Sequence, residues 1–567
     1  MRVSVYVLGW VACASCYGMP RIKGATGTSG ADGGAAGGAA GALGSGGSGG
    51  GPAGGGASDG GSESPSTTCD AASPPGPPKV LRPTRGAYTG SLHAPTAIAT
   101  LRPTFSWAAV APTCGAVTYE LQADDSCSPG ALDACAFPSP ELDATGVSAL
   151  TYAPAANLKV STTAPVGAFY AWRVRACDAS SRCGPWSEVR YLHVGRVRED
   201  INGDGYGDLL AVSNRGIEVY LGSSQFDVSG PSLTIPYGSY GDVPTFSGDV
   251  NGDGYGDFFG ATIYLPSSGQ APTIYFGGST IATPQTLVLT KSAGGPSTMM
   301  QTTSAGDLNG DGFADLIVQW AYGITTPTTE LRVFFGGIAV ANTPDLSIPG
   351  PYVNDYTLQH SGRVGDLNGD GFEDIALTAF SDERANGGMV QLFVGGRHPT
   401  STAVSLATMA AEYRVEPIGD VNQDGFDDAL IVYPGASYAL YRGAATLATT
   451  VAMTWNDATA SSATGGFDLD RDGFSDFVVG TTAFMSILYR GGATNPARVA
   501  SGISRLTSST IVAFSDHDGD GRPDLVGLDS SNGPASIQWA GSDGTTDPRS
   551  FIVRLPDDVM FHGELVR

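Results

Sequence analysis

A nine-residue pattern recurs seven times in the last two-thirds of the chain, and it constrains the fold more than any other feature. The copies begin at residues 200, 249, 307, 366, 420, 468 and 516, and the third reads DLNGDGFAD. Successive copies start 48 to 59 residues apart. A unit repeated at this interval is typical of a repeat architecture, in which every unit is one supersecondary element.

Each copy places oxygen-bearing side chains where a metal loop needs them. Positions 1, 3, 5 and 9 carry Asp or Asn, and position 6 is always Gly, which permits the positive φ of a sharp turn. With the backbone carbonyl of position 7, this is an all-oxygen ligand set, which suits Ca²⁺ better than Mg²⁺. The predicted calcium ligands are Asp200, Asn202, Asp204, Tyr206, Asp208, Asp249, Asn251, Asp253, Tyr255, Asp257, Asp307, Asn309, Asp311, Phe313, Asp315, Asp366, Asn368, Asp370, Phe372, Asp374, Asp420, Asn422, Asp424, Phe426, Asp428, Asp468, Asp470, Asp472, Phe474, Asp476, Asp516, Asp518, Asp520, Arg522 and Asp524.

A tight hairpin turn and an EF-hand share parts of this pattern. Asn-Gly and Asp-Gly favour tight hairpin turns by themselves, but a simple turn has no need of Asp at positions 1 and 9 in all seven copies. An EF-hand needs Glu at position 12 and helices on both sides. Position 12 is never Glu here, and an apolar β-type run such as LIVQW follows the loop. We therefore expect each loop to join two strands.

The rest of each unit also predicts strands. A second recurring element, such as VFFGG or LFVGG, follows 14 to 21 residues after position 9 and ends in a Gly turn in most copies. With the strand before the loop, the strand after it and an outer connecting strand, each unit holds about four strands. Seven such units are predicted to close into an all-β, seven-bladed β-propeller. Aromatic residues at position 7 are expected to pack over their own hairpin, a role that Arg522 does not fit.

Over about residues 196–567 the chain resembles the FG-GAP repeat family, to which the propeller of integrin α-subunits belongs. The resemblance implies that the loops bind Ca²⁺ on one face of the ring and that other loops meet the ligands. Unlike integrins, this chain keeps the loop in all seven units. The ligand positions hold 23 Asp, close to the whole net charge of −25. Because clustered carboxylates repel one another without a cation, up to seven calcium ions are expected to be structural.

Residues 76–195 show short alternating runs between Pro and Gly turns, which predicts a β-sandwich. The stretches PPGPPKVLRPTRG and YAWRVRACD resemble a fibronectin type III domain. Trp107, Trp172 and Trp186 are expected in its core. All six cysteines beyond the N-terminal region lie between residues 69 and 183, which favours disulfides over zinc, with the pairs Cys127–Cys135 and Cys177–Cys183 expected.

The N-terminus predicts export. Residues 1–16 have the order of a bacterial signal peptide and resemble a lipoprotein signal, with Cys16 as the lipidated residue; simple secretion is the alternative. Residues 17–75 are mostly Gly, Ala and Ser and are expected to be a disordered linker. The protein is thus expected at the cell envelope, at the outer membrane or surface, with the lipid as its only membrane attachment.

No catalytic constellation is evident in the sequence. The six His residues are scattered, and His517, at a non-ligand loop position, is expected to face solvent. The acidic balance argues against nucleic acid as a partner. The leading hypothesis is a non-catalytic, monomeric binding or adhesion protein for a glycan or protein ligand. A secreted polysaccharide lyase or hydrolase and a purely structural envelope component are the alternatives.

Overall fold

The computed structural model describes most of the chain after residue 72. The described residues are 73–94, 101–213, 215–226, 230–236, 244–260, 272–290, 297–322, 328–349, 357–380, 388–409, 414–433, 437–448, 450–456, 460–481, 486–499, 510–528, 535–538 and 559–561. Among them no helix is long and apolar enough to cross a membrane. The expected signal peptide, Cys16 and nearly all of the linker lie outside these ranges.

Strands β1 to β8 form two sheets, which we call the two-sheet segment (residues 80–194). One sheet has the order β1-β3-β6 and the other β2-β8-β7-β4-β5. Only β2 and β8 pair in parallel within these sheets. The strands are β1 (Val80–Arg82), β2 (Ala87–Thr89), β3 (Phe105–Trp107), β4 (Thr118–Asp124), β5 (Leu142–Val147), β6 (Thr151–Tyr152), β7 (Ala168–Cys177) and β8 (Arg190–Val194).

Alternating side chains of both sheets enclose one core in this segment. Trp107 and Trp172 are buried in it, as expected, together with Phe105 and Tyr170. Trp186 is only partly buried, and the guanidinium groups of Arg173 and Arg175 stack on it. The predicted disulfides Cys127–Cys135 and Cys177–Cys183 are both confirmed.

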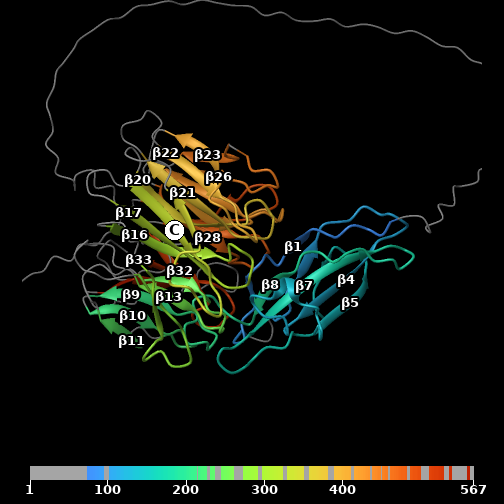
Figure 1. Cartoon of the computed structure of the whole chain (residues 1–567), viewed down its shortest axis with the longest axis horizontal. Coiled ribbons are helices and arrows are strands. Elements are labelled where there is room, and N and C mark those ends of the chain that lie inside the picture. The colour runs from blue at the N-terminus through green and yellow to red at the C-terminus, as the bar shows by residue number, and fades with distance from the viewer. Residues whose placement is uncertain are drawn as a thin grey trace, which may run out of the picture. The chain divides into compact units, whose positions relative to one another are not determined.

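The remaining described strands form six four-stranded sheets and one three-stranded sheet (Figure 1). Their orders are β11-β10-β9-β35, β12 to β15, β16 to β19, β20 to β23, β24 to β27, β28 to β31, and β32 to β34. The strands are β9 (Leu209–Ser213), β10 (Gly216–Tyr220), β11 (Leu233–Pro236), β12 (Thr245–Gly248), β13 (Asp257–Gly260), β14 (Thr273–Tyr275), β15 (Thr286–Val288), β16 (Ser297–Gly306), β17 (Asp315–Tyr322), β18 (Thr328–Phe334), β19 (Leu346–Pro349), β20 (Thr357–Gly365), β21 (Asp374–Phe380), β22 (Gly388–Phe393), β23 (Ala403–Met409), β24 (Arg414–Gly419), β25 (Asp428–Tyr433), β26 (Ser437–Tyr441), β27 (Met453–Asn456), β28 (Ala460–Phe467), β29 (Asp476–Thr481), β30 (Ser486–Arg490), β31 (Ala497–Arg498), β32 (Thr510–Ser515), β33 (Asp524–Leu528), β34 (Ala535–Gln538) and β35 (Val559–Phe561).

These sheets are the blades of a β-propeller. The first strands of consecutive sheets lie side by side, β12 with β16, β16 with β20, β20 with β24 and β24 with β28. In Figure 1 the sheets surround one centre, with β16, β20 and β28 close to it. Neighbouring sheets bury their apolar side chains against each other, as Leu331 and Val333 of β18 do with Ile375 and Leu377 of β21. Position 12 of every repeat lies inside a strand, which excludes an EF-hand.

The first blade departs from the expected order. The sequence predicts a strand before each loop, but loop 1 follows β8 of the two-sheet segment. Its blade is instead completed by β35, which pairs antiparallel with β9 through Val559↔Ser213 and Phe561↔Ala211. The two ends of the repeat region therefore share one sheet, so that β9 has a partner on both sides.

Removing β35 is expected to destabilise the ring, because it exposes the edge of β9. We expect a chain ending at residue 555 to melt at least about 5 °C lower than the full chain, a shift that needs only a few kcal/mol. Differential scanning calorimetry measures the shift. A synthetic peptide of residues 556–567 is expected to restore the melting temperature, and a scrambled peptide is the control. An unchanged melting temperature would contradict the closing role of β35.

Candidate metal centres

Each acidic loop folds as one rigid turn between two strands. In the third copy, β16 ends at Gly306 and pairs with Asp315 at the start of β17, so the loop spans the hairpin end. Position 6 has the predicted positive φ in all seven copies, between 83° and 96°. Position 4 also has positive φ, and in loops 5 and 6 the residues there are Gln423 and Arg471 rather than Gly.

Carboxylates at positions 1 and 5 organise the turn through backbone hydrogen bonds. The position-1 carboxylate accepts the N–H of the position-6 Gly in every copy, as Asp307 does from Gly312 at 2.9 Å. The position-5 carboxylate accepts the N–H of position 7 in every copy, as Asp311 does from Phe313 at 3.0 Å. Hydrogen bonds from the backbone of the loop thus hold the carboxylates of positions 1 and 5 in place without a ligand.

The position-9 Asp ties the loop to the strands that follow. All seven position-9 residues are completely buried. One carboxylate oxygen accepts the N–H of position 2, as Asp374 does from Leu367 at 3.0 Å. In six copies the other oxygen accepts an N–H from the Gly turn after the third strand, as Asp374 does from Gly395 at 2.9 Å. This explains the recurring Gly turn, whose role the sequence alone did not reveal.

In two of the loops, the side-chain oxygen atoms of positions 1, 3 and 9 converge. In loop 6, oxygens of Asp468, Asp470 and Asp476 lie within 4.8 Å of one another, and loop 7 repeats this arrangement. Several ligand-position oxygens are buried without a hydrogen-bond partner: Asn422 Oδ1, Asp470 Oδ1 and Asp516 Oδ1. Converging, unsatisfied hard oxygen atoms fit a divalent cation such as calcium.

The electrostatics of the loops also favour a bound cation. Burial, together with the charge of the neighbouring Asp204, raises the pKa of Asp200 to about 7. Burial likewise raises the pKa of Asp307 to about 6 and that of Asp516 to about 7, with like charges in each loop adding to the effect. Without a cation, these carboxyl groups hold protons at a pH at which ordinary Asp is ionised.

We expect these pKa shifts to make the metal-free protein less stable as the pH rises. A raised folded-state pKa contributes stability that is fully present below the unfolded value near 3.8 and is lost as the pH rises through about 6 to 7. The melting temperature in chelator is therefore expected to fall between pH 5 and pH 8. Thermal melts at both pH values, with and without excess calcium, measure this. A melting temperature in chelator that rises over this interval would contradict it.

The position-7 aromatic rings pack differently from the expectation. Five of the six lie on the position-4 Gly of the preceding loop rather than over their own hairpin. The ring of Tyr255 lies against Gly203, where an added Cβ would be 2.6 Å from a ring carbon, and Phe426 contacts Gly369 in the same way. Tyr206 of loop 1 lies on Gly519 of loop 7, which closes the cycle. In the five loops with Gly at position 4 these contacts leave no room for a side chain there, whereas loops 5 and 6 carry Gln423 and Arg471 at that position.

Backbone hydrogen bonds also join neighbouring loops. The N–H of position 8 donates to the position-1 carbonyl of the preceding loop, as Ala314 does to Asp249 at 3.0 Å and Gly207 does to Asp516 at 2.8 Å. Six loops donate in this way. The seventh has Pro523 at position 8, which has no N–H to donate. Each loop therefore depends on the conformation of its neighbour.

His517 does not face solvent, contrary to the expectation. It is completely buried, and its Nδ1 lies 2.7 Å from the Gly207 carbonyl oxygen. The physical reason is that position 2 is a core position, occupied by Ile201, Val250 and Leu308 in the first three loops and buried in each. Burial lowers the pKa of His517 to about 4.

The two-sheet segment contacts the face that carries the loops. Tyr191 Oη donates to Asp307 Oδ2 at 2.8 Å, and Arg82 donates to Asp420 Oδ2 at 2.7 Å. Both acceptors are position-1 carboxylates. Just after β8, the Arg196 guanidinium lies 3.9 Å from a third, that of Asp249. The sequence carries no local signal for these partners, because the contacts join residues far apart in the chain.

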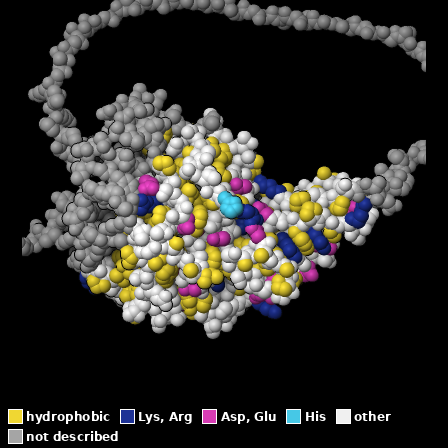
Figure 2. Space-filling view, viewed as in Figure 1, with side chains coloured by type: hydrophobic (Ala, Val, Ile, Leu, Met, Phe, Trp, Pro, Cys, Tyr) yellow, Lys and Arg dark blue, Asp and Glu magenta, His cyan; other side chains and the backbone are white. Residues whose placement is uncertain are grey.

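Ring stacking and backbone bonds extend this interface. His93 stacks on Tyr206 with 4.1 Å between the ring centroids, and Lys79 lies 3.9 Å above the centroid of Phe426. The Gly130 N–H donates to the Asp311 carbonyl at 2.6 Å. Residues 76–195 hold nine Lys and Arg against eight acids, whereas the whole chain carries −25. In Figure 2 most of the Lys and Arg side chains in view lie toward the right, over the part that carries β4 and β5. This near-neutral segment is electrostatically suited to the acidic loops.

Comparisons with known protein families identify part of the repeat region. The FG-GAP-like repeat model matches residues 200–260, and the FG-GAP repeat model matches residues 301–320. A search of curated proteins found no match. Similar solved structures include the periplasmic gluconolactonase PpgL of Pseudomonas aeruginosa, with 13% identity over 63% of this chain and 98% of that chain and a TM-score of 0.40. A structure of BBS1N in complex with ARL6DN matches with 10% identity over 63% of this chain and 92% of that chain, with a TM-score of 0.36. The Dos1 propeller has 8% identity over 68% of this chain and 82% of that chain, with a TM-score of 0.32.

These structural similarities are too distant to carry an argument about activity. The matched stretches cover the first three of the seven acidic loops. The chain therefore contains FG-GAP repeats, and its sheets form a β-propeller.

Proposed function

We propose that the chain is a seven-bladed, calcium-stabilised propeller joined to a fibronectin type III-like sandwich, and that it acts as a non-catalytic binding or adhesion protein. The observation that carries the proposal is the cycle of seven acidic loops. In two of the loops three carboxylates converge, some buried ligand-position oxygens have no hydrogen-bond partner, and the carboxylates of positions 1, 5 and 9 accept hydrogen bonds from backbone N–H groups of the ring. This is the arrangement of a structural metal site rather than of a catalytic pair.

In this role the metal supplies positive charge and fixes the loops. The side-chain oxygens of positions 1, 3, 5 and 9 and the carbonyl of position 7 are the ligands we propose for each ion. Because the two-sheet segment contacts the loop face, we place the surface for a glycan or protein ligand on other turns of the ring or on the sandwich. The proposed protein is a monomer and has no nucleic-acid partner.

Metal analysis and ligand arrays test the proposal. Purified protein is expected to contain calcium, up to seven ions per chain, and to bind members of a glycan or protein array in a calcium-dependent manner. Turnover of a bound polysaccharide would favour the enzyme alternative. Calcium content without any ligand would favour a structural envelope component. Protein purified in calcium buffers that contains none would contradict the metal part of the proposal.

We also propose export and attachment to the bacterial envelope through a lipid on Cys16. Mass analysis of the mature N-terminus tests this part. An acylated Cys16 is the expected result. A mature chain that begins elsewhere without acylation would indicate secretion.

A further inference from the structure

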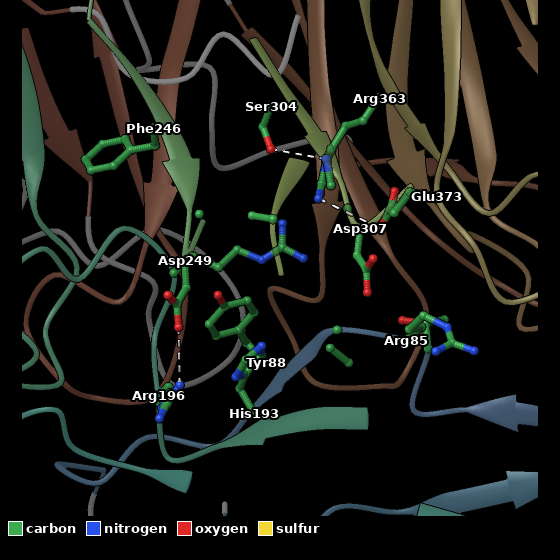
Figure 3. Close-up of a pocket in the computed structure, with 18 of the residues that line it drawn as sticks. Arg85, Tyr88, His193, Arg196, Phe246, Asp249, Ser304, Asp307, Arg363 and Glu373 are labelled. Atoms are coloured by element: carbon green, nitrogen blue, oxygen red, sulfur yellow. Dashed lines mark hydrogen bonds and ion pairs between the residues drawn. The ribbon is translucent and has the colours of Figure 1, made fainter. Parts of the chain in front are cut away.

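Three position-1 carboxylates receive donors from outside the ring, and each receives them on the same oxygen atom, Oδ2. The pairs are Tyr191 with Asp307 at 2.8 Å, Arg82 with Asp420 at 2.7 Å, and Arg196 with Asp249 at 3.9 Å (Figure 3). In all three loops Oδ2 is also the oxygen that accepts the N–H of the position-6 Gly. The donors from the two-sheet segment, and from Arg196 just after it, thus leave the other oxygen of each carboxylate to the loop.

That other oxygen, Oδ1, stays within its own loop. Asp307 Oδ1 accepts the N–H groups of Gly310 and Asp311 at 2.7 and 3.0 Å. In loop 7, Oδ2 of Asp516 again bonds the position-6 Gly, and Oδ1 is buried without a hydrogen-bond partner. Oδ1 is therefore the oxygen left for the proposed ion. A cation on Oδ1 and a donor on Oδ2 do not exclude each other, and each holds the carboxylate in the orientation that the other requires.

The two-sheet segment also bonds to the backbone of the loop turns. The Val166 N–H donates to the Gly203 carbonyl at 2.9 Å, and the Gly130 N–H donates to the Asp311 carbonyl at 2.6 Å. These acceptors are position 4 of loop 1 and position 5 of loop 3. The directions of their carbonyl groups depend on the conformation of the turn, which a bound ion fixes. A loop already ordered by its ion loses less conformational entropy when the segment docks on it.

One calcium ion does not cancel the charge of a loop. Loops 2, 3 and 5 each hold three Asp and one Asn at the ligand positions, so each keeps one negative charge when one Ca²⁺ is bound. A guanidinium group lies at each of these loops. Arg196 is at loop 2, Arg82 is at loop 5, and Arg85 donates to the Gly310 carbonyl of loop 3 at 3.2 Å. The cationic side chains are therefore still attracted to the loops after calcium has bound.

We propose that calcium binding and docking of the two-sheet segment are coupled: the loaded loops hold the segment on the ring, and the docked segment raises their calcium affinity. Tyr191, Arg82 and Arg196 are positioning residues, because they act on the ion through a carboxylate. The coupling is reciprocal, since each binding event changes the free energy of the other by the same amount. This inference rests on the proposed calcium loops. It adds that a fall in free calcium releases the segment from the loop face.

Calcium titration of two matched variants of the full chain tests the coupling. Tyr191→Phe removes one hydroxyl group from the interface, whereas Tyr170→Phe removes one that donates to the Lys159 carbonyl at 2.7 Å within the segment. Native mass spectrometry counts the bound ions at each free calcium concentration. Tyr191→Phe is expected to bind one of its ions only at about tenfold higher free calcium, because a hydrogen bond to a charged group is lost, and Tyr170→Phe is not. Unchanged calcium binding by Tyr191→Phe would overturn the coupling, and so would equal weakening in both variants.

Amide hydrogen exchange of the unaltered chain measures the docking itself. The N–H groups of Gly130 and Val166 report on the interface. The N–H of Ser187, which donates at 2.8 Å to a carbonyl inside the two-sheet segment, reports whether the segment stays folded. As free calcium falls, the two interface amides are expected to exchange faster while Ser187 and strand β17 of the ring remain protected.

The possible outcomes separate this inference from the proposed function. Calcium-binding protein whose interface amides are equally protected at every calcium concentration would overturn the coupling and leave the metal proposal standing. If β17 loses protection together with the interface amides, the calcium titration of the two Phe variants decides the question. Protein that binds no calcium would count against the proposed function, and with it against this coupling.

Discussion

Chelation of calcium is expected to lower the melting temperature of the protein by at least about 10 °C at pH 8 and to leave the ring largely unfolded at 37 °C. One site at a hundredfold excess over its Kd stabilises the folded state by about 2.7 kcal/mol. Several such sites together exceed the 5–15 kcal/mol that is typical of the total stability of a domain. Backbone bonds also join each of six loops to the preceding one, so loss of one ion is expected to weaken the neighbouring loops.

Thermal melts and far-UV circular dichroism in calcium, in chelator and in magnesium measure this effect. Magnesium is expected to restore little stability, because it demands a tighter octahedral geometry than these loops offer. Identical melts in chelator and in calcium would contradict a structural role for the metal.

A substitution at position 9 is expected to have the second large effect. Asp374→Asn keeps the size of the side chain but places an NH₂ group against one of two backbone N–H donors, those of Leu367 and Gly395. Since Asp374 is completely buried, we expect a loss of about 3 kcal/mol of unfolding free energy. Denaturant unfolding in saturating calcium measures this loss.

Asp370→Asn in the same loop is the matched control. Asp370, at position 5, is exposed, and an amide oxygen can still accept the N–H of Phe372. We expect this variant to bind calcium less tightly and to recover nearly the stability of the unaltered chain, within about 1 kcal/mol, at high calcium. Asp374→Asn is not expected to recover. If both variants recovered equally, position 9 would act only through the metal.

The order of elements in each blade follows from local signals. The 48-to-59-residue repeat, the apolar runs after each loop and the Gly turn of the third strand are short-range patterns, and strands occur where they predict them. The two disulfides were also predictable, because each closes a short loop. The sequence did not indicate that β35 completes the first blade, since a three-residue strand far from its partner has no local signature.

The loops of the candidate site were predictable because their signal is local. Most of their contacts with other parts of the chain were not, because those contacts are long-range. Asp and Gly at fixed spacing identify the loop and its acids. The partners that restrain the loop come from other blades or from the two-sheet segment. The ring of Tyr255 lies on Gly203 of the preceding loop, and Tyr191 reaches Asp307 across 116 positions of the chain. Such contacts depend on how blades stack, which the periodicity of one blade does not specify.

The pairing of β35 with β9 has a consequence for how the protein is made. The first blade is completed by a strand that is synthesised after all the other blades, so β9 has to wait for it with one edge unpaired. Contacts between such distant positions form slowly, because a long loop of chain must close first. A product of interrupted translation would keep an open strand edge, which other chains can pair with. Pairing of β35 with β9 is therefore itself a checkpoint in the maturation of the ring.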